Sequence, residues 1–342
     1  MSARGSDPLR LGLPPQPGAQ QLGPLRPGPL RLGSRRSPMA VAQSRQVADM
    51  ITARTGREVE LVGVTTLGDV SRAQLTQIGG TGVFVSALRE ALLSGEVDLA
   101  VHSLKDLPTG PAAGIVLAAV PPRDDPRDVL VARDGVKLAD LPAGARIGTG
   151  SPRRAAQLLS LRHDLRCVPI RGNAGTRMGK VDAGEVDAVV LAYAGLARIG
   201  QVSAISQIFE PDEMLPAPGQ GALAVECRDG EPGLAELLGT VDHLASRTAV
   251  TAERSLLEAL EAGCSAPIGA YAAGTDQLQM QAAVMSPDGS RMLRAHGSAA
   301  GPGAWQLGRD LAAELLRAGA SDLITGPEQA QPATGTSTRN DV

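Results

Sequence analysis

The sequence contains few aromatic residues and no long apolar run, and these two shortages exclude several classes of protein. Among 342 residues, the aromatic ones are Trp305, Tyr193, Tyr271, Phe84 and Phe209. So few rings cannot build a stacking platform for single-stranded nucleic acid or an aromatic cage for a cation. No run of about 18 apolar residues is present to span a bilayer. We therefore expect no nucleic-acid partner and no membrane association.

Cysteine and histidine are also scarce. Cys167, Cys227 and Cys264 form no C-x-x-C pair and are too few for a disulfide framework. The histidines show no H-E-x-x-H or other ligand spacing. We expect no metal site, and a reducing, cytoplasmic compartment is the simplest account of the cysteines.

Lysine is nearly absent, and the net charge is only −3. Lys105, Lys137 and Lys180 are the only lysines among 33 basic residues, so the other 30 are arginines. This net charge gives no overall field that would attract nucleic acid or an acidic membrane surface. An arginine-rich composition can also reflect a GC-rich genome, so only the positions of individual arginines are informative. Any anion binding is expected to be local.

Two segments far apart in the chain repeat one pattern. RLGSRRSPMA (31–40) and RIGTGSPRRA (146–155) each indicate a short strand, a Gly/Ser turn and a helix that opens with Ser-Pro. Ser37 and Ser151 suit the N-cap, where a hydroxyl accepts from a free backbone amide, and proline is tolerated at the next position.

A second repeat follows each of these segments. SGEVDLAV (94–101) matches AGEVDAVV (183–190), and in both a glycine that ends a helix precedes an apolar run typical of a buried parallel strand. Two similar α/β domains are predicted. In open α/β sheets ligands bind beyond the carboxyl ends of the strands, so the two domains should face each other across a cleft.

The last third of the chain has a different pattern. Residues 246–262 have helical periodicity, and two strand-like runs flank an SPDG turn before a helix at about 304–318. We therefore expect a small C-terminal α+β domain over 244–326. Residues 1–29 are rich in proline and glycine and are expected to form a disordered extension, and 327–342 a tail.

Several arginines follow the predicted strands of the two α/β domains. A strand, turn and helix start presents free amides and the positive end of the helix dipole, which suits carboxylates or phosphates. A solvated surface charge is the alternative for any single arginine, but their common place at strand ends favours a ligand with several negative groups. The arginines in question are Arg35, Arg36, Arg153, Arg154, Arg171, Arg177 and Arg198.

HSLKDLP (102–108) places Lys105 and Asp106 side by side directly after a buried strand. A carboxylate in a basic cleft can transfer protons. The alternative is a surface turn that caps the next segment. His102 is interpreted as a structural histidine.

The three cysteines differ in context. Cys167 and Cys227 lie in strand-like apolar runs and are interpreted as small core residues. Cys264 follows a predicted helix and precedes a Pro/Gly loop, where a thiol is either exposed and reactive or simply a loop residue.

Together these segments closely resemble one family, porphobilinogen deaminase, also called hydroxymethylbilane synthase, of tetrapyrrole biosynthesis. The resemblance covers about residues 30–325. The matching segments, in order, are GSRRSP, IGGTGVF, DLAVHSLKDLP, DDPRDVL, IGTGSPRR, RGNAGTR, GEVDAVVLAYAGLARIG, LPAPGQGALAVECR and EAGCSAPIG.

The resemblance implies an α/β fold of two domains like those of periplasmic binding proteins, facing a cleft, plus the small α+β domain. Domain 1 would comprise 30–121 and 221–240, and domain 2 would comprise 122–220. It also implies porphobilinogen as the small-molecule substrate. A monomer is the default expectation for the oligomeric state.

The resemblance further assigns roles to residues. Cys264 would hold a dipyrromethane cofactor through a thioether, and Asp106 would be the catalytic residue. The side chains that bind the acetate and propionate groups of substrate and cofactor would be Arg35, Ser37, Ser103, Lys105, Thr149, Ser151, Arg153, Arg154, Arg171, Arg177, Arg198 and Gln220.

The implied reaction is the head-to-tail condensation of four porphobilinogen molecules with loss of ammonia, followed by release of linear hydroxymethylbilane. A chain of up to six rings with two carboxylates each is an extended polyanion, which bidentate arginines suit. Two rival classes remain. An anion-binding sensor or carrier would share the repeats but would have no use for Cys264, and a nucleic-acid binder would need a basic face.

Overall fold

The computed structural model describes residues 28–64, 82–261 and 266–325. Cys264 and nearly all of the segments 1–29 and 327–342 lie outside these residues. Within them, the first sheet has five strands in the order β2-β1-β3-β10-β4. The strands are β1 (Leu30–Ser34), β2 (Val59–Gly63), β3 (Leu99–Ser103), β4 (Ile115–Ala119) and β10 (Leu223–Arg228).

The second sheet has the order β7-β6-β8-β5-β9. Its strands are β5 (Asp128–Ala132), β6 (Arg146–Gly148), β7 (Arg166–Val168), β8 (Ala188–Ala192) and β9 (Gln207–Ile208). In both sheets three parallel strands are followed by an antiparallel fourth, β10 in the first and β5 in the second. The internal repeat in the sequence therefore corresponds to a repeated sheet.

Helices cover both faces of each sheet, which is why the central strands are apolar throughout. In the first sheet α1 (Pro38–Thr55) and α7 (Pro232–Gly239) share a core with one face, and α3 (Gly82–Leu93) packs on the other. In the second, α4 (Pro152–Leu161) lies opposite α5 (Ala174–Asp182) and α6 (Tyr193–Arg198).

Both predicted Ser-Pro helix starts are confirmed. The hydroxyl of Ser37 accepts a hydrogen bond from the amide three residues later at 3.3 Å, and Ser151 does the same at 3.4 Å. Gly95 and Gly184, one at the start of each second repeat, both have φ of 73°. This left-handed backbone is easily adopted only by glycine, so both turns demand it.

The third unit is an antiparallel sheet of β11 (Ile268–Ala273), β12 (Gln277–Met285) and β13 (Met292–Ala300). Three helices share its core: α8 (Leu244–Ala259), α9 (Ala304–Arg317) and α10 (Ala320–Thr325). The predicted fold class, two α/β domains with a smaller α+β domain, is confirmed.

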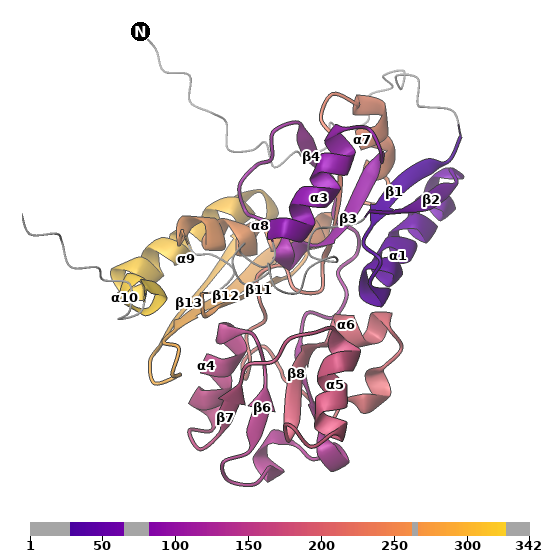
Figure 1. The fold of residues 1–342 in the computed structure, drawn as a ribbon. Coiled ribbons are helices and arrows are strands. Elements are labelled where there is room, and N and C mark those ends of the chain that lie inside the picture. Colours follow the sequence, from indigo (N-terminus) through magenta and orange to yellow (C-terminus); the bar gives the residue numbers. More distant parts are fainter. Residues whose placement is uncertain (1–27, 65–81, 262–265, 326–342) are drawn as a thin grey trace, which may run out of the picture.

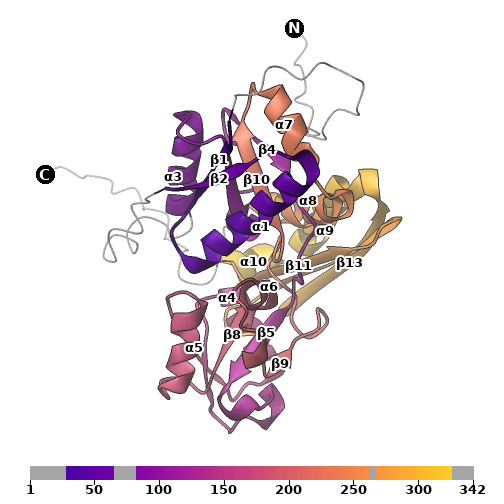
Figure 2. The same ribbon diagram turned by 90° about the vertical axis from the view of Figure 1, so that its right-hand side faces the viewer.

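The two α/β domains lie end to end, and the third lies beside them in contact with both (Figure 1). The turned view shows α1 above α6 where the first two domains meet (Figure 2). The chain passes between these domains twice, through 120–127 and 209–222. Among the described residues, no helix has the length and apolar character that a membrane span requires.

Candidate functional site

A cavity of about 670 Å³ lies between the two α/β domains, and both contribute to its wall. Arg35 and Ser37 come from the start of α1, and Ser103 ends β3. The second domain contributes Arg154, Arg177 and Arg198, and the second crossing contributes Gln220. The structure therefore brings together nine of the predicted site residues: Arg35, Ser37, Ser103, Lys105, Asp106, Arg154, Arg177, Arg198 and Gln220.

Lys105 and Asp106 lie on a single turn of 3₁₀-helix (Leu104–Asp106) that directly follows β3. Leu104 and Leu107 are buried on either side of them, so the turn is anchored by its apolar residues while Lys105 and Asp106 line the cavity. No group in the described part of the chain donates a hydrogen bond to the Asp106 carboxylate. Both carboxylate oxygens of Asp106 therefore accept no hydrogen bond from the described residues.

Lys105 is held close to several other charges. Its Nζ donates to Oε1 of Gln220 at 3.1 Å. Burial and the neighbouring Arg154 guanidinium lower the pKa of Lys105 to about 8, while the Asp106 carboxylate opposes this shift. Lys105 is still protonated at neutral pH, and an additional carboxylate in the cavity would stabilise its charged form.

Gln220 connects the two walls of the cavity. It is fully buried, and its Nε2 donates to the carbonyl of Pro126 at 2.7 Å and to Oδ1 of Asp128 at 2.9 Å. Because its Oε1 accepts from Lys105, the amide is fixed in one orientation. One side chain thus links the cation of the first domain to a carboxylate of the second.

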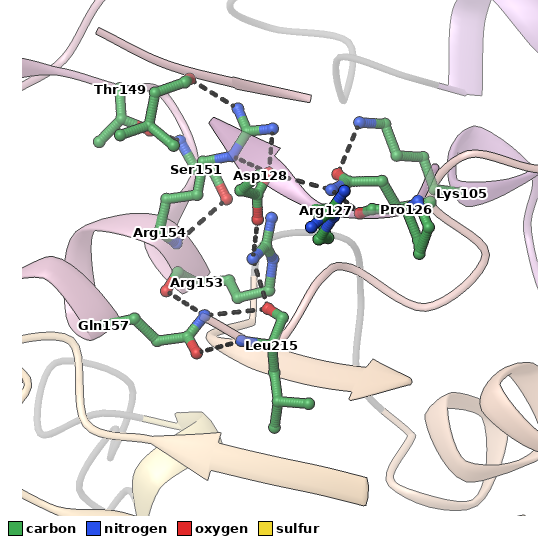
Figure 3. A network of polar contacts seen from close by, with 12 residues as sticks. Lys105, Pro126, Arg127, Asp128, Thr149, Ser151, Arg153, Arg154, Gln157 and Leu215 are labelled. Atoms are coloured by element: carbon green, nitrogen blue, oxygen red, sulfur yellow. Dashed lines mark hydrogen bonds and ion pairs between the residues drawn. The ribbon is translucent and has the colours of Figure 1, made fainter. Parts of the chain in front are cut away.

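Asp128, at the start of β5, is the centre of this network (Figure 3). Its Oδ1 accepts from Nε and Nη2 of Arg154 at 2.9 and 2.7 Å, and its Oδ2 accepts from Nη1 of Arg153 at 2.6 Å. Burial opposes ionisation, but the two guanidinium groups outweigh it and hold the pKa of Asp128 well below its usual range. One buried carboxylate therefore orients both arginines of the Ser-Pro helix.

Sequence reasoning assigned no role to Asp128. It lies inside the DDPRDVL segment and is the first residue of an otherwise apolar strand. This position was the feature of the sequence that could have indicated a buried ion pair. A charged residue at such a position needs a partner. The sequence alone could not show that both Arg153 and Arg154 would reach it.

Arg153 lies behind Asp128, away from the cavity lining. Its Nη1 also donates to the carbonyl of Leu215 at 2.5 Å, and its side chain is buried. Thr149 is buried, and its hydroxyl accepts from the amide of Ser151 at 3.2 Å. These residues shape the start of α4. Arg171 is exposed and is not among the lining residues of the cavity.

Two other predicted arginines are held by the backbone near the cavity. Nε of Arg177 donates to the carbonyl of Gly172 at 2.9 Å, and burial together with Arg154 lowers the pKa of Arg177. Arg198 donates to Oδ2 of Asp124 at 2.9 Å and to the carbonyl of Gly221 at 2.8 Å, so it ties α6 to both crossings. Each guanidinium is therefore fixed in place.

The charges around the cavity are strongly unequal. Lysine and arginine contribute five lining side chains, whereas Asp106 is the only carboxylate among the described lining residues. Such a cavity favours a ligand with several negative groups.

Cys167, Cys227 and His102 were also singled out from the sequence, and of these His102 contributes to the lining of the cavity. Burial raises the pKa of the Cys167 thiol to about 11 and that of Cys227 to about 12, so neither is a thiolate at neutral pH. Nε2 of His102 lies 3.2 Å from Oε2 of Glu226, which also accepts from Arg89. Burial opposes ionisation of Glu226, but these partners lower its pKa to about 2.

Two family models match the chain. Residues 30–236 match "Porphobilinogen deaminase, dipyromethane cofactor binding domain", and 247–317 match "Porphobilinogen deaminase, C-terminal domain". The chain belongs to the porphobilinogen deaminase family. The described residues that line the cavity all lie within the first match, which is the model of the family's cofactor-binding domain.

Proteins named porphobilinogen deaminase are similar over nearly their whole length. That of Thermobifida fusca is 60% identical over 86% of this chain and 96% of its own. Porphobilinogen deaminase 1 of Streptomyces coelicolor is 55% identical over 86% and 97%, and the protein of Leifsonia xyli is 51% identical over 87% and 95%.

Solved structures with lower similarity include two periplasmic proteins. The VFT2 domain of Bordetella pertussis BvgS has a TM-score of 0.39 and 19% identity over 63% of this chain and 85% of that one. A periplasmic substrate-binding protein from Coxiella burnetii has a TM-score of 0.39 and 16% identity over 66% and 96%.

The cavity of this porphobilinogen deaminase family member fits the cofactor that the first family model names. A dipyrromethane that carries acetate and propionate groups needs cationic partners, and Lys105, Arg154, Arg177 and Arg198 surround the cavity. Burial, and after it the neighbouring Arg154, lowers the pKa of both Lys105 and Arg177, and a bound carboxylate would oppose both shifts.

Proposed function

We propose that the chain is a transferase that condenses four porphobilinogen molecules head to tail, with loss of ammonia, on a covalently held dipyrromethane, and releases linear hydroxymethylbilane. Membership of the porphobilinogen deaminase family supports this reaction. The observation that carries it is the cavity in which Asp106 is the one described acid among five cationic side chains.

Asp106 is proposed as the catalytic residue. When the aminomethyl group of porphobilinogen leaves as ammonia, the substrate becomes electron-poor, and a nearby carboxylate stabilises the positive charge. The same carboxylate then accepts the proton from the pyrrole carbon that has been attacked. Asp106 then passes this proton to the released ammonia, which leaves as ammonium, so the carboxylate is ionised again and can serve the next condensation.

The remaining predicted site residues are proposed to bind the carboxylates of substrate and cofactor. Arg35, Lys105, Arg154, Arg177 and Arg198 have the strongest support because they line the cavity. Asp128 and Gln220 orient Arg154 and Lys105. The full proposed set is Arg35, Ser37, Ser103, Lys105, Thr149, Ser151, Arg153, Arg154, Arg171, Arg177, Arg198 and Gln220, of which Thr149, Ser151, Arg153 and Arg171 do not line the described cavity.

Cys264 is proposed as the attachment point of the dipyrromethane, which supplies the nucleophilic pyrrole carbon on which the chain grows. Cys264 lies outside the described residues, a few positions beyond the end of α8. The other two cysteines are poor candidates, because burial keeps both thiols protonated at neutral pH.

We further propose a monomer in the cytoplasm, with domain 1 formed by 30–121 and 221–240, domain 2 by 122–220 and domain 3 by 244–326. The pairing of β10 with β3 and β4 supports the return of the chain to the first domain. The unpaired thiols of Cys167 and Cys227 are consistent with a reducing compartment.

The test is the mass of denatured, desalted protein from a host that supplies porphobilinogen. We expect the wild-type chain to be heavier than its sequence by two linked pyrrole units and to release ammonia and a linear tetrapyrrole from porphobilinogen. A thioether survives denaturation, whereas a merely bound ligand does not. Cys264→Ser should lack the added mass, and the matched variants Cys167→Ser and Cys227→Ser should keep it.

The outcomes separate the competing functions. A wild-type chain of polypeptide mass that binds porphobilinogen without turnover would be an anion carrier. Added mass that persists in Cys264→Ser would move the attachment point to another residue while leaving the reaction in place.

A further inference from the structure

Helix α8 of the third domain lies against the turn that carries Lys105 and Asp106. From α8, Nη1 of Arg254 donates to the carbonyl of Leu107 at 3.1 Å, with a longer contact of 3.4 Å to that of Leu104. Nη2 donates to the carbonyl of Pro108 at 2.7 Å, with a contact of 3.5 Å to Thr109. One guanidinium therefore reaches the backbone on both sides of Asp106.

Within the turn, the amide of Leu107 donates to the carbonyl of Leu104 at 3.1 Å. The carbonyls of Leu107 and Pro108 come after this bond and have no partner within the turn, and an arginine near a C-terminal end is a common way to satisfy such groups. Leu104 and Leu107 are buried in one cluster with Val250, which lies one turn before Arg254 on α8. The backbone of the turn is thus fixed from the third domain, and Lys105 and Asp106 face the cavity.

We infer that Arg254 is a positioning residue for Asp106. This inference rests on the proposed function. Arg254 is not among the residues that line the cavity, so it acts through the backbone of 104–109 and not on the substrate. Its loss would let the turn move, and a displacement of about 1 Å at a reacting group can cost about 10²-fold in rate.

Arg247 provides a matched control on the same helix. It is buried, its Nε donates to Asp242 at 2.9 Å, and its Nη2 donates to the carbonyl of Ala118 at 3.0 Å. Arg247 therefore supports the backbone of β4 in the first domain as Arg254 supports the 104–109 turn. Replacement of Arg247 should destabilise the same domain contact without moving Asp106.

The experiment compares purified holoenzymes of the wild type, Arg254→Met, Arg254→Lys and Arg247→Met, with their cofactor content checked by mass. For each, kcat and KM for porphobilinogen, the melting temperature and the hydrogen exchange of peptides covering 104–109 are measured. We expect Arg254→Met to lower kcat about 10- to 100-fold with KM changed less than about threefold, and to speed exchange in 104–109. Arg254→Lys should be intermediate, because an ammonium cannot span both pairs of carbonyls.

Arg247→Met should lower the melting temperature while keeping kcat within about twofold of the wild type. The inference is overturned if Arg254→Met keeps wild-type kcat, or if both methionine variants lose kcat in proportion to their stability. If Arg254→Met does not fold, Arg254→Lys tests the inference instead. A lowered kcat with a nearly unchanged KM would support it, and a wild-type kcat would overturn it. A wild type without turnover would overturn the proposed function instead, and exchange in 104–109 would still decide whether Arg254 holds the turn.

Discussion

At the scale of single residues, the site has more positive than negative charge, because the buried carboxylate of Asp128 faces two guanidinium groups. Asp128 neutralises only one of the two guanidinium groups that it orients. The remaining positive charge stays beside Lys105, where it adds to the effect of burial in lowering the pKa of the ammonium group. A cavity arranged in this way is more stable with carboxylates bound than without them, because each added negative charge relieves repulsion among fixed cations.

Asp106→Asn tests the role of the single acid. The amide keeps the size of the side chain but cannot carry the negative charge or accept a proton, so we expect product formation to fall by about 10²–10⁴-fold. The melting temperature should change little, since no described group donates a hydrogen bond to this carboxylate. Steady-state turnover of porphobilinogen by the mass-checked holoenzyme measures the effect.

Asp140→Asn is the control, because Asp140 is also the last residue of a 3₁₀ turn, Leu138–Asp140, and it is exposed outside the cavity. It should retain wild-type turnover. If Asp106→Asn also stayed within a fewfold of the wild type, Asp106 would be a structural turn residue.

At the scale of elements, the features that could be predicted from the sequence are those that depend on neighbouring residues. The Ser-Pro helix starts and the two glycines with positive φ are confirmed, because capping and left-handed backbone depend on neighbouring residues. The antiparallel fourth strand of each sheet could not be predicted from pattern alone, because an apolar run carries no direction. The role of Asp128 could not be predicted either, because its partners lie 25 and 26 residues away in another element and the local sequence does not show that they meet.

The hairpin between β12 and β13 reaches the second domain at Gly289. This residue has φ of 72°, and a Cβ there would lie 2.3 Å from the carbonyl oxygen of Ala156 and 2.8 Å from the amide of Ser160. Both belong to α4, the helix whose first turn carries Arg154. The close approach of the turn to α4 thus connects the third domain to the cavity wall.

Gly289→Ala should therefore destabilise the protein more than an alanine at a matched glycine. Gly56 has φ of 69° with open space around its Cβ position, so Gly56→Ala incurs only the left-handed backbone penalty of about 1–2 kcal/mol. Gly289→Ala should add about 1–3 kcal/mol for the steric overlap, and it should raise KM as α4 shifts. Urea unfolding and steady-state kinetics of both variants provide the comparison, and equal losses of stability would mean that the hairpin yields without disturbing α4.

At the scale of the whole molecule, one carboxylate of the third domain holds both connections between the other two. Glu253 on α8 is fully buried and accepts from Nη1 and Nη2 of Arg123 in the first crossing at 2.6 and 3.0 Å. It also accepts from the amide of Gly219 in the second crossing at 2.6 Å and from that of Ala272 in β11 at 2.8 Å. The separation of the two cavity walls is therefore coupled to the third domain.

Replacement of this carboxylate should loosen the three domains together. In Glu253→Gln the buried guanidinium of Arg123 loses its counter-charge, and breaking a buried ion pair from one side costs about 3–5 kcal/mol. We expect a large fall in melting temperature and a raised KM, because Gln220 and Lys105 depend on the second crossing for their positions. Glu185→Gln is the control, since Glu185 pairs with Lys180 on the surface and should contribute less than about 1 kcal/mol. Calorimetry of both holoenzymes gives the two melting temperatures. If Glu253→Gln melted at the same temperature as Glu185→Gln, packing alone, without this carboxylate, would hold the crossings in place.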